Sequence, residues 1–212
     1  MPRLHNAPQT RERLLDAAER LFAEHGAAAT SLRAVTNGAG ANPAAVHYHF
    51  GSKEDLLLAV AQRRADPLNA ERLERLSRLE ASADGEALPL APIVEAFLAP
   101  EILNTAPSPS AILHREPRED VARIVPRLFG EVHLRFSQAL ARALPELSPT
   151  LLDARLHFVV GLMLHAVRGF TEMPTLSARH RTASSHDREA LLAQLVCFSV
   201  AGLAAPGRES TP

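Results

Sequence analysis

The apolar positions near the start of the chain recur at the spacing of an amphipathic helix. Thr10 is a favourable N-cap residue, and Gly26 can supply the left-handed stop after the last apolar position. The apolar residues that share one face are Leu14, Ala18, Leu21 and Phe22. The pattern therefore predicts a helix over about residues 10 to 25.

Three further helical segments follow at short intervals. Ser31 is an N-cap type that opens a second segment, which ends at Gly40, and Pro43 can open a third at a position where a missing N–H costs nothing. Ser52 can cap a fourth, since the acidic Glu54 and Asp55 in its first turn complement the helix dipole. The apolar faces are Leu32, Val35 and Ala39 in the second segment, Val46 and Phe50 in the third, and Leu56, Leu57 and Val60 in the fourth.

The rest of the chain alternates apolar segments with loops marked by proline. Pro67 is expected to interrupt the fourth helix, after which residues 69–83 continue with helical spacing. The later helical segments are about 91–103, 108–115, 119–143, 149–172 and 186–205. Because no strand-like alternation and no repeat of fixed period is present, the sequence predicts an all-α fold with about nine helices.

Two C-terminal segments, 156–167 and 191–203, are apolar almost all round. Such helices must be buried on more than one side, which a homodimer paired through the helices near 149–172 and 186–205 would achieve. Small residues that permit close approach are Gly161, Ala166, Ala201 and Gly202. The run 156–167 is shorter than the ~20 residues needed to span a bilayer, so we expect no membrane partner.

Composition narrows the class of protein. The 212 residues are 46% apolar and 22% charged with a net charge of -1, which is a globular composition. The single cysteine, Cys197, excludes an intrachain disulfide and any zinc site built on paired cysteines, and favours a cytoplasmic location. The 4% aromatic content, without tryptophan, argues against a stacking platform for single-stranded nucleic acid.

The charges are unevenly distributed. Residues 1–64 carry eight cations and six acids, and the stretch 27–53 contains no carboxylate. A phosphate backbone can approach such a surface. Two short helices joined by a tight glycine-containing turn fit a helix-turn-helix, and they equally fit a plain helical hairpin; the carboxylate-free stretch favours DNA binding.

The run from Thr10 to Val60 resembles the N-terminal DNA-binding domain of the tetracycline-repressor (TetR) family of bacterial regulators. The shared features are Phe-x-x-x-Gly at the first helix end, Thr-Ser before the second helix, Ala-Gly before the turn, and Tyr-His-Phe-x-x-Lys-Glu. The departures are Val35-Thr36, Ala41 and His47, where the family usually has Ile-Ala, Val and a tyrosine. Pro-Glu-Leu at 145–147 is similar to C-terminal domains in some branches, and the resemblance implies a dimer.

The resemblance also implies two sets of DNA-contacting residues. The phosphate-contacting set is Ser31, Tyr48, His49 and Lys53, and the base-facing set is Arg33, Asn42, Ala44, Ala45 and His47. Arg33 suits a bidentate contact to guanine, whereas Ala44 and Ala45 suit only a thymine methyl or close approach. A recognition helix this poor in hydrogen-bonding groups indicates that DNA shape contributes to specificity.

Each of these residues has an alternative interpretation. Tyr48 and Phe50 could both be core aromatics; we favour that interpretation for Phe50, and for Tyr48 we favour the phosphate contact. Lys53, the only lysine, could be a merely solvated charge. His47 and His49 are two residues apart and therefore face different ways on a helix, so we expect no metal site there.

In the C-terminal half the residues suit a ligand pocket better than a catalytic centre. The candidate ligand-binding residues are Phe97, Leu103, His133, Phe136, Met163, His165 and Arg168, with Ile102 and Phe158 as further apolar lining. Glycine-rich phosphate loops, nucleophile elbows and zinc-protease motifs are absent from the sequence. His157 and His165, eight residues apart, suit a core or interface role, and we expect no catalytic residue and no cofactor.

The resulting hypothesis is a ligand-responsive transcriptional regulator, acting as a repressor, that binds a near-palindromic operator as a homodimer and senses a small, largely apolar effector. Control by a partner protein remains an alternative to the effector, and an all-α enzyme or helical interaction module without sequence-specific DNA binding remains an alternative to the whole. The expected divisions are a mobile arm at 1–9, a DNA-binding domain at 10–62, a ligand-binding and dimerisation domain at 63–205, and a mobile tail at 206–212.

Overall fold

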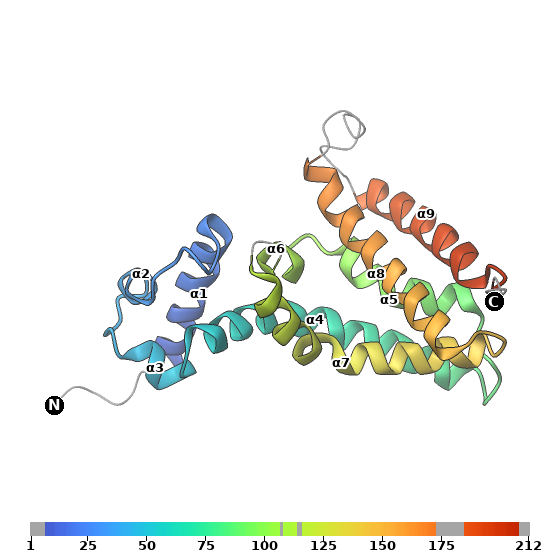
Figure 1. Ribbon diagram of the computed structural model, residues 1–212, viewed down its shortest axis with the longest axis horizontal. Coiled ribbons are helices and arrows are strands. Elements are labelled where there is room, and N and C mark those ends of the chain that lie inside the picture. Colours follow the sequence, from blue (N-terminus) through green and yellow to red (C-terminus); the bar gives the residue numbers. More distant parts are fainter. Residues whose placement is uncertain (1–6, 107, 114–115, 173–184, 208–212) are drawn as a thin grey trace, which may run out of the picture. The chain divides into compact units, whose positions relative to one another are not determined.

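The structure is a computed structural model that describes residues 7–106, 108–113, 116–172 and 185–207. All regular structure in these residues is helical, so the all-α prediction is confirmed (Figure 1). The helices are α1 (Ala7–His25), α2 (Leu32–Gly38), α3 (Ala45–Phe50), α4 (Lys53–Ser82), α5 (Leu90–Leu103), α6 (Pro109–Leu113), α7 (Arg118–Ala143), α8 (Pro149–Glu172) and α9 (Ser185–Ala204). Residues 1–6 of the arm and 208–212 of the tail expected from the sequence lie outside the described residues.

The chain packs into two compact units. The first unit contains residues 1–66 and 107–128, and the second contains 67–106 and 129–212. Helices α4 and α7 each begin in the first unit and end in the second. The sequence analysis assigns 107–128 to the C-terminal domain, whereas their contacts are with the N-terminal helices.

The first unit has a small core to which all of its N-terminal helices contribute. Helix α1 buries Leu14 and Phe22, and α2 and α3 each contribute one valine, Val35 and Val46. The start of α4 completes this core with Leu56, Leu57, Val60 and Ala61. Because α3 has only six residues, a single buried side chain fixes its face, and its other positions are left for the surface.

The predicted helix boundaries are met closely, with two differences. Ser31 caps α2, its Oγ accepting the Ala34 N–H at 3.1 Å, and Gly26 adopts a positive φ of 80° at the end of α1. Helix α1 begins at Ala7 rather than after a Thr10 cap, because Pro8 is tolerated in a first helical turn. Helix α3 begins at Ala45, two residues after Pro43.

Helix α5 forms the centre of the second unit. Residues 93–102 of α5 are buried except for Glu95, and the helix packs against α8 and α9 (Figure 1). Helix α7 adds Val132, Phe136 and Leu140 to the same core. A helix buried on almost every side must be apolar over most of its surface, and α5 meets this except at the buried Glu101.

The prediction that Pro67 interrupts the fourth helix is wrong. Helix α4 runs without interruption through Pro67, which is exposed while Ala65 and Leu68 beside it are buried. A proline removes one backbone hydrogen bond and bends a helix, and burial of the flanking residues holds both halves in place. The division between the two units falls between Asp66 and Pro67.

The apolar part of α8 is longer than the run counted from the sequence. Residues Pro149–Val167 form a 19-residue stretch of mean hydropathy 1.4 that is long and apolar enough to cross a membrane by length and composition alone. A helix that packs in a protein core or an interface passes the same test. Only 28% of this stretch is buried within the chain, so much of its apolar surface is uncovered.

Candidate DNA-binding site

The turn between α2 and α3 is held by backbone hydrogen bonds and by Asn42. The Ala41 N–H donates to the Thr36 carbonyl at 2.9 Å, and the Asn42 side-chain oxygen accepts the Ala44 N–H at 2.9 Å. An asparagine that accepts a backbone N–H two residues on is an Asx turn, which satisfies an orphan donor at the start of a helix. Asn42 therefore lies before α3, and its carboxamide oxygen helps to fix where α3 begins.

The base-facing residues predicted from the sequence lie mostly on the exposed side of this motif. Arg33, Ala44 and His47 are exposed, and Ala45 is half-buried. The His47 Nδ1 lies 2.9 Å from the Gly51 carbonyl oxygen, to which it can only donate. This bond holds the imidazole at the end of α3 and leaves Nε2 available to a partner.

Two of the residues predicted to contact phosphates, Tyr48 and His49, belong to α3. Tyr48 is 78% exposed, which excludes the core interpretation that the sequence left open for it. His49 is half-buried beside it, with the two ring centroids 4.9 Å apart and nearly perpendicular. Phe50 is half-buried rather than a full core residue, and the guanidinium of Arg11 lies 5.2 Å from its ring centroid.

Lys53 is not simply solvated. Its Nζ donates to the Ala28 carbonyl at 3.1 Å and so joins the first residue of α4 to the loop between α1 and α2. The cap of α4 is as predicted, since the Ser52 Oγ accepts the Asp55 N–H at 3.0 Å. The charge of Lys53 is thereby held beside the start of α2.

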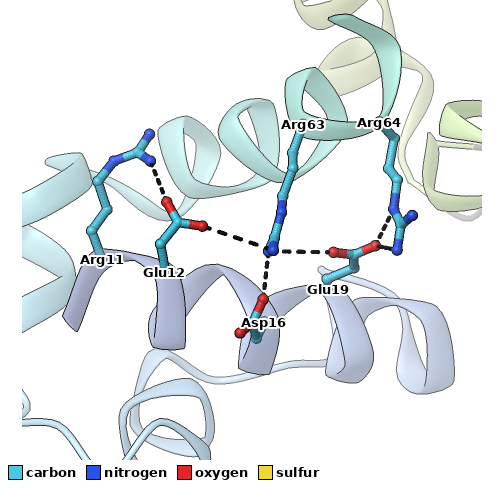
Figure 2. Close-up of polar contacts among 6 residues, drawn as sticks. All are labelled: Arg11, Glu12, Asp16, Glu19, Arg63 and Arg64. Carbon is cyan, nitrogen blue, oxygen red and sulfur yellow. Dashed lines mark hydrogen bonds and ion pairs between the residues drawn. The ribbon is translucent and has the colours of Figure 1, made fainter. Parts of the chain in front are cut away.

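The acids of α1 are paired with two arginines of α4 (Figure 2). Arg63 reaches the carboxylate of Asp16 at 2.6 Å, and Arg64 pairs with Glu19. Arg63 also lies 3.8 Å from Glu12 and 3.7 Å from Glu19. The hydrogen bond that Arg63 donates to Asp16 and the charges of the three acids raise the pKa of Arg63. These pairs join α1 to α4 and neutralise acids that would otherwise repel a phosphate.

A further contact to the helix-turn-helix was not identified from the sequence. The Glu116 carboxylate accepts the Ala27 N–H at 2.7 Å, and both residues are buried. The two residues are 89 positions apart, and no periodic pattern relates them. Among the described residues no group of three or more His, Cys, Asp or Glu side chains could hold a metal ion.

The ligand-binding residues predicted in the second unit are brought together only in part. Phe97, Phe136 and Met163 are buried in one cluster, and the rings of Phe97 and Phe136 are 5.1 Å apart. His133 and His165 are exposed, and the imidazole of His133 lies 3.2 Å from Asp153. The remaining candidates are Leu103, 36% exposed at the end of α5, and Arg168, whose side chain lies outside the described part.

The polar centre of that cluster is Arg72, which the sequence analysis missed. Arg72 is 2% exposed and contacts Glu101 at 3.0 Å, Asn69 at 3.1 Å and the Phe97 carbonyl at 2.9 Å. Its guanidinium lies 5.3 Å from the Phe97 ring centroid. Burial lowers the pKa of Arg72, partly offset by the charge of Glu101. The sequence around Arg72 reads as a charged surface helix, so no local signal marks it as buried.

The outward faces of α8 and α9 carry apolar and small residues. Phe158 and Phe198 are 69% and 70% exposed, and Cys197 and Ala201 are exposed beside Phe198. A side chain added at Gly161 or Gly202 would meet no atom of the chain within 4 Å. The exposed surface of these two neighbouring helices thus carries two phenylalanines, although His157, His165 and Gln194 are exposed on the same helices.

Known proteins resemble the chain in both halves. Residues 14–60 match the family described as bacterial regulatory proteins, tetR family, and residues 110–202 match the tetracyclin repressor-like C-terminal domain. The transcriptional regulator BetI of Rhizobium meliloti is 34% identical over 97 residues, which cover 40% of this chain and 48% of BetI. The chain therefore spans about half the length of that relative.

Solved structures show the same fold. SmeT, the repressor of the Stenotrophomonas maltophilia multidrug efflux pump SmeDEF, is 24% identical with a TM-score of 0.63, covering 98% of this chain and 100% of SmeT. A complex of SmeT with triclosan matches at a TM-score of 0.65 and 23% identity, covering 96% of this chain and 98% of that one. A complex of RolR with its ligand resorcinol matches at a TM-score of 0.53 and 17% identity, covering 98% of this chain and 99% of that one.

The helix-turn-helix geometry and the two family matches agree on one class of protein. The capped α2 and the exposed α3 lie within the first family match, and α7 and α8 lie within the second. The family consists of DNA-binding regulators rather than enzymes. The chain belongs to the TetR family of bacterial transcriptional regulators.

Proposed function

We propose that the protein is a repressor that binds a near-palindromic operator as a homodimer and releases it when a small, largely apolar effector binds. The observation that carries the proposal is the carboxylate-free stretch 27–53, whose exposed Arg33, His47 and Tyr48 all belong to the helix-turn-helix. Phosphate contacts supply most of the affinity for duplex DNA, and side chains at base edges supply specificity.

In this proposal the two sets of side chains act separately. Arg33 makes a bidentate contact to guanine in the major groove, and His47 offers Nε2 as an acceptor because Nδ1 is held by Gly51. Ala44 and Ala45 allow close approach of α3 to the bases. Tyr48, Ser31 and Lys53 position the motif on the phosphates, as do the free N–H groups at the start of α4.

A homodimer is supported by the outward faces of α8 and α9. Uncovered phenylalanines next to alanine and glycine are costly in water and suit close helix packing against a second copy. Two copies related by a two-fold axis form a four-helix bundle from their α8 and α9 helices. Such a dimer places two recognition helices about one DNA turn apart, as a near-palindrome requires.

An effector site is supported by the cluster around Phe97, Phe136 and Met163. Apolar lining with a few polar anchors is typical of small-molecule sites, and Arg72 with Glu101 supplies such anchors. SmeT and RolR have been solved with triclosan and resorcinol, both small aromatic molecules.

Release of DNA follows from differential affinity. An effector shifts the protein away from its DNA-binding conformation only if it binds the other conformation more tightly. By linkage, operator DNA must weaken effector binding by the same factor. A ligand that binds equally well with and without operator would contradict this part of the proposal.

The test of DNA recognition is fluorescence anisotropy with the DNA that flanks the gene of this protein. We expect saturable binding whose log affinity falls linearly with log salt. Arg33→Ala should lower the preference for this DNA over a scrambled sequence about tenfold, the cost of one bidentate base contact. Arg78→Ala is the matched control, because it removes an equally exposed arginine of the second unit. Equal affinity of the wild type for both DNAs would contradict the proposal.

A further inference from the structure

The loop between α1 and α2 is fixed by side chains from three different places. It covers residues 27–30 and ends directly before Ser31, the N-cap of α2. The three contacts are Thr30 Oγ1 to the Gly26 carbonyl at 2.8 Å, Lys53 Nζ to the Ala28 carbonyl at 3.1 Å, and the Ala27 N–H to Glu116 Oε1 at 2.7 Å. The position of this loop therefore sets where α2 begins.

The contact from Glu116 is unlike the other two. It comes from the connection between α6 and α7, whereas Thr30 and Lys53 belong to the helix-turn-helix and its immediate continuation. Ala27 is 2% exposed and Glu116 is 8% exposed, so the bond is shielded from water. A hydrogen bond from a backbone N–H to a carboxylate is strengthened in such surroundings.

The backbone of Glu116 is itself held in place. Its N–H donates to the carbonyl of Leu113, the last residue of α6, at 3.1 Å. Helix α7 begins two residues later and continues to Phe136, which is fully buried in the core of the second unit. Glu116 is thus the point at which the start of α7 contacts the loop that leads into α2.

We propose that Glu116 is a positioning residue for DNA recognition: through the Ala27 N–H it fixes the α1–α2 loop, and thereby the start of α2 with Ser31 and Arg33, to the position of α7. The inference rests on the proposed function, since it assigns Glu116 a part in operator binding. Glu116 is an acid and makes no contact with DNA. It acts by raising the fraction of molecules whose α2 is correctly placed.

The test compares two variants in which an uncharged side chain of similar size replaces the Glu116 side chain. Glu116→Gln keeps an oxygen that accepts the Ala27 N–H, whereas Glu116→Met removes it and leaves a buried donor unpaired. If only about one molecule in ten of the Met variant keeps the loop in place, its operator affinity falls about tenfold. The Gln variant should stay within about twofold of the wild type. Both variants should keep the wild-type salt slope, because no phosphate contact is lost.

Hydrogen exchange of the Ala27 amide gives a readout that does not depend on DNA. The Ala27 amide should be protected in the wild type and in Glu116→Gln, and should exchange faster in Glu116→Met, with the α5 and α9 amides unchanged. Glu119→Gln is the control for loss of charge at the start of α7, since Glu119 is exposed. Circular dichroism verifies that all variants remain helical.

The outcomes separate the inference from the proposed function. Weak operator binding and fast Ala27 exchange in Glu116→Met, both absent in Glu116→Gln, support the inference. Wild-type operator affinity in Glu116→Met overturns the inference and leaves the proposed function intact. An equal loss of operator affinity in the Gln and Met variants also overturns the inference, because the acceptor oxygen would then have no effect on DNA binding. A wild-type protein without preference for the flanking DNA overturns the proposed function and the inference with it.

Discussion

The two units distribute their charged and aromatic side chains in opposite ways. In the first unit the arginines of α4 that pair with α1 are partly exposed, and among its described large hydrophobic side chains the most exposed is the amphipathic Tyr48. In the second unit Arg72 and Glu101 are buried, whereas Phe158 and Phe198 are exposed. Arg63 and Arg72 belong to the same helix and differ only in what packs around them.

The difference indicates which partner suits each unit. Exposed cations, a phenol and imidazoles on a stretch of chain that contains no carboxylate suit a phosphate backbone. Exposed phenylalanines among small residues suit another protein surface. The pKa of Arg63 is raised by Asp16, and the pKa of Arg72 is lowered by burial. The same type of side chain thus experiences opposite electrostatic effects in the two units.

The largest effect is expected from removing Arg72. Arg72→Met leaves the carboxylate of Glu101 buried without its guanidinium, which should cost about 3–5 kcal/mol of unfolding free energy. Urea denaturation followed by circular dichroism measures this loss. The double variant Arg72→Met/Glu101→Met should recover most of it, because no buried charge remains. A loss below about 1 kcal/mol in the single variant would show that burial does not distinguish this pair from an exposed one.

The next largest effect concerns the apolar face of the second unit. Phe198→Glu should weaken self-association about a hundredfold or more, because it removes apolar contact and brings two like charges together at a two-fold axis. Light scattering after size exclusion, over a range of concentrations, measures the change. Leu134→Glu is the matched control, since Leu134 is 56% exposed on α7 and outside the proposed interface. Equal behaviour of both variants would place the interface elsewhere.

A smaller effect is expected at the exposed aromatic of the first unit. Tyr48→Phe removes only the hydroxyl and should weaken DNA binding at least about tenfold, the lower end of the value of one hydrogen bond to a charged group. The loss should be equal for the flanking and the scrambled DNA, because a phosphate contact carries no sequence information. Anisotropy on both DNAs measures it. A loss confined to the flanking DNA would assign Tyr48 to a base contact instead.

The smallest effect is expected in the network between α1 and α4. Arg63→Ala should cost about 0.2–1 kcal/mol of unfolding free energy, since Asp16, its nearest partner, and Glu12 are more than half exposed, and the difference from wild type should shrink in 1 M salt. Because the pKa of Arg63 is raised in the folded state, this contribution is complete at neutral pH and is lost only as the pH rises through that alkaline value. A larger, salt-independent loss would contradict the contrast with Arg72.

The sequence predicted the fold better than the sites. Helical period and caps such as Ser31 and Ser52 placed the helices to within a few residues, because these signals are local. Pro67 was misjudged, since whether a proline ends a helix or bends it depends on the burial of its neighbours. The resemblance named the residues of α2 and α3, and the structure leaves Arg33, His47 and Tyr48 exposed as that assignment requires.

The long-range contacts could not be predicted from the sequence. Arg72 stands in a run of charged residues that reads as a solvated face, and its partner Glu101 is 29 positions away on α5. The same holds for Glu116 and Ala27, since no local pattern links a carboxylate to a backbone N–H so far along the chain. His133 and His165 were grouped with the ligand-binding residues by chemistry, yet both are exposed.

The central claim is that two copies of this helix-turn-helix recognise one DNA site. Hydroxyl-radical footprinting of the purified protein on the DNA flanking its gene tests it most directly. The account predicts two protected segments whose centres lie about one helical turn, or about 10 base pairs, apart. A single protected segment, or uniform weak protection along the whole fragment, would contradict it.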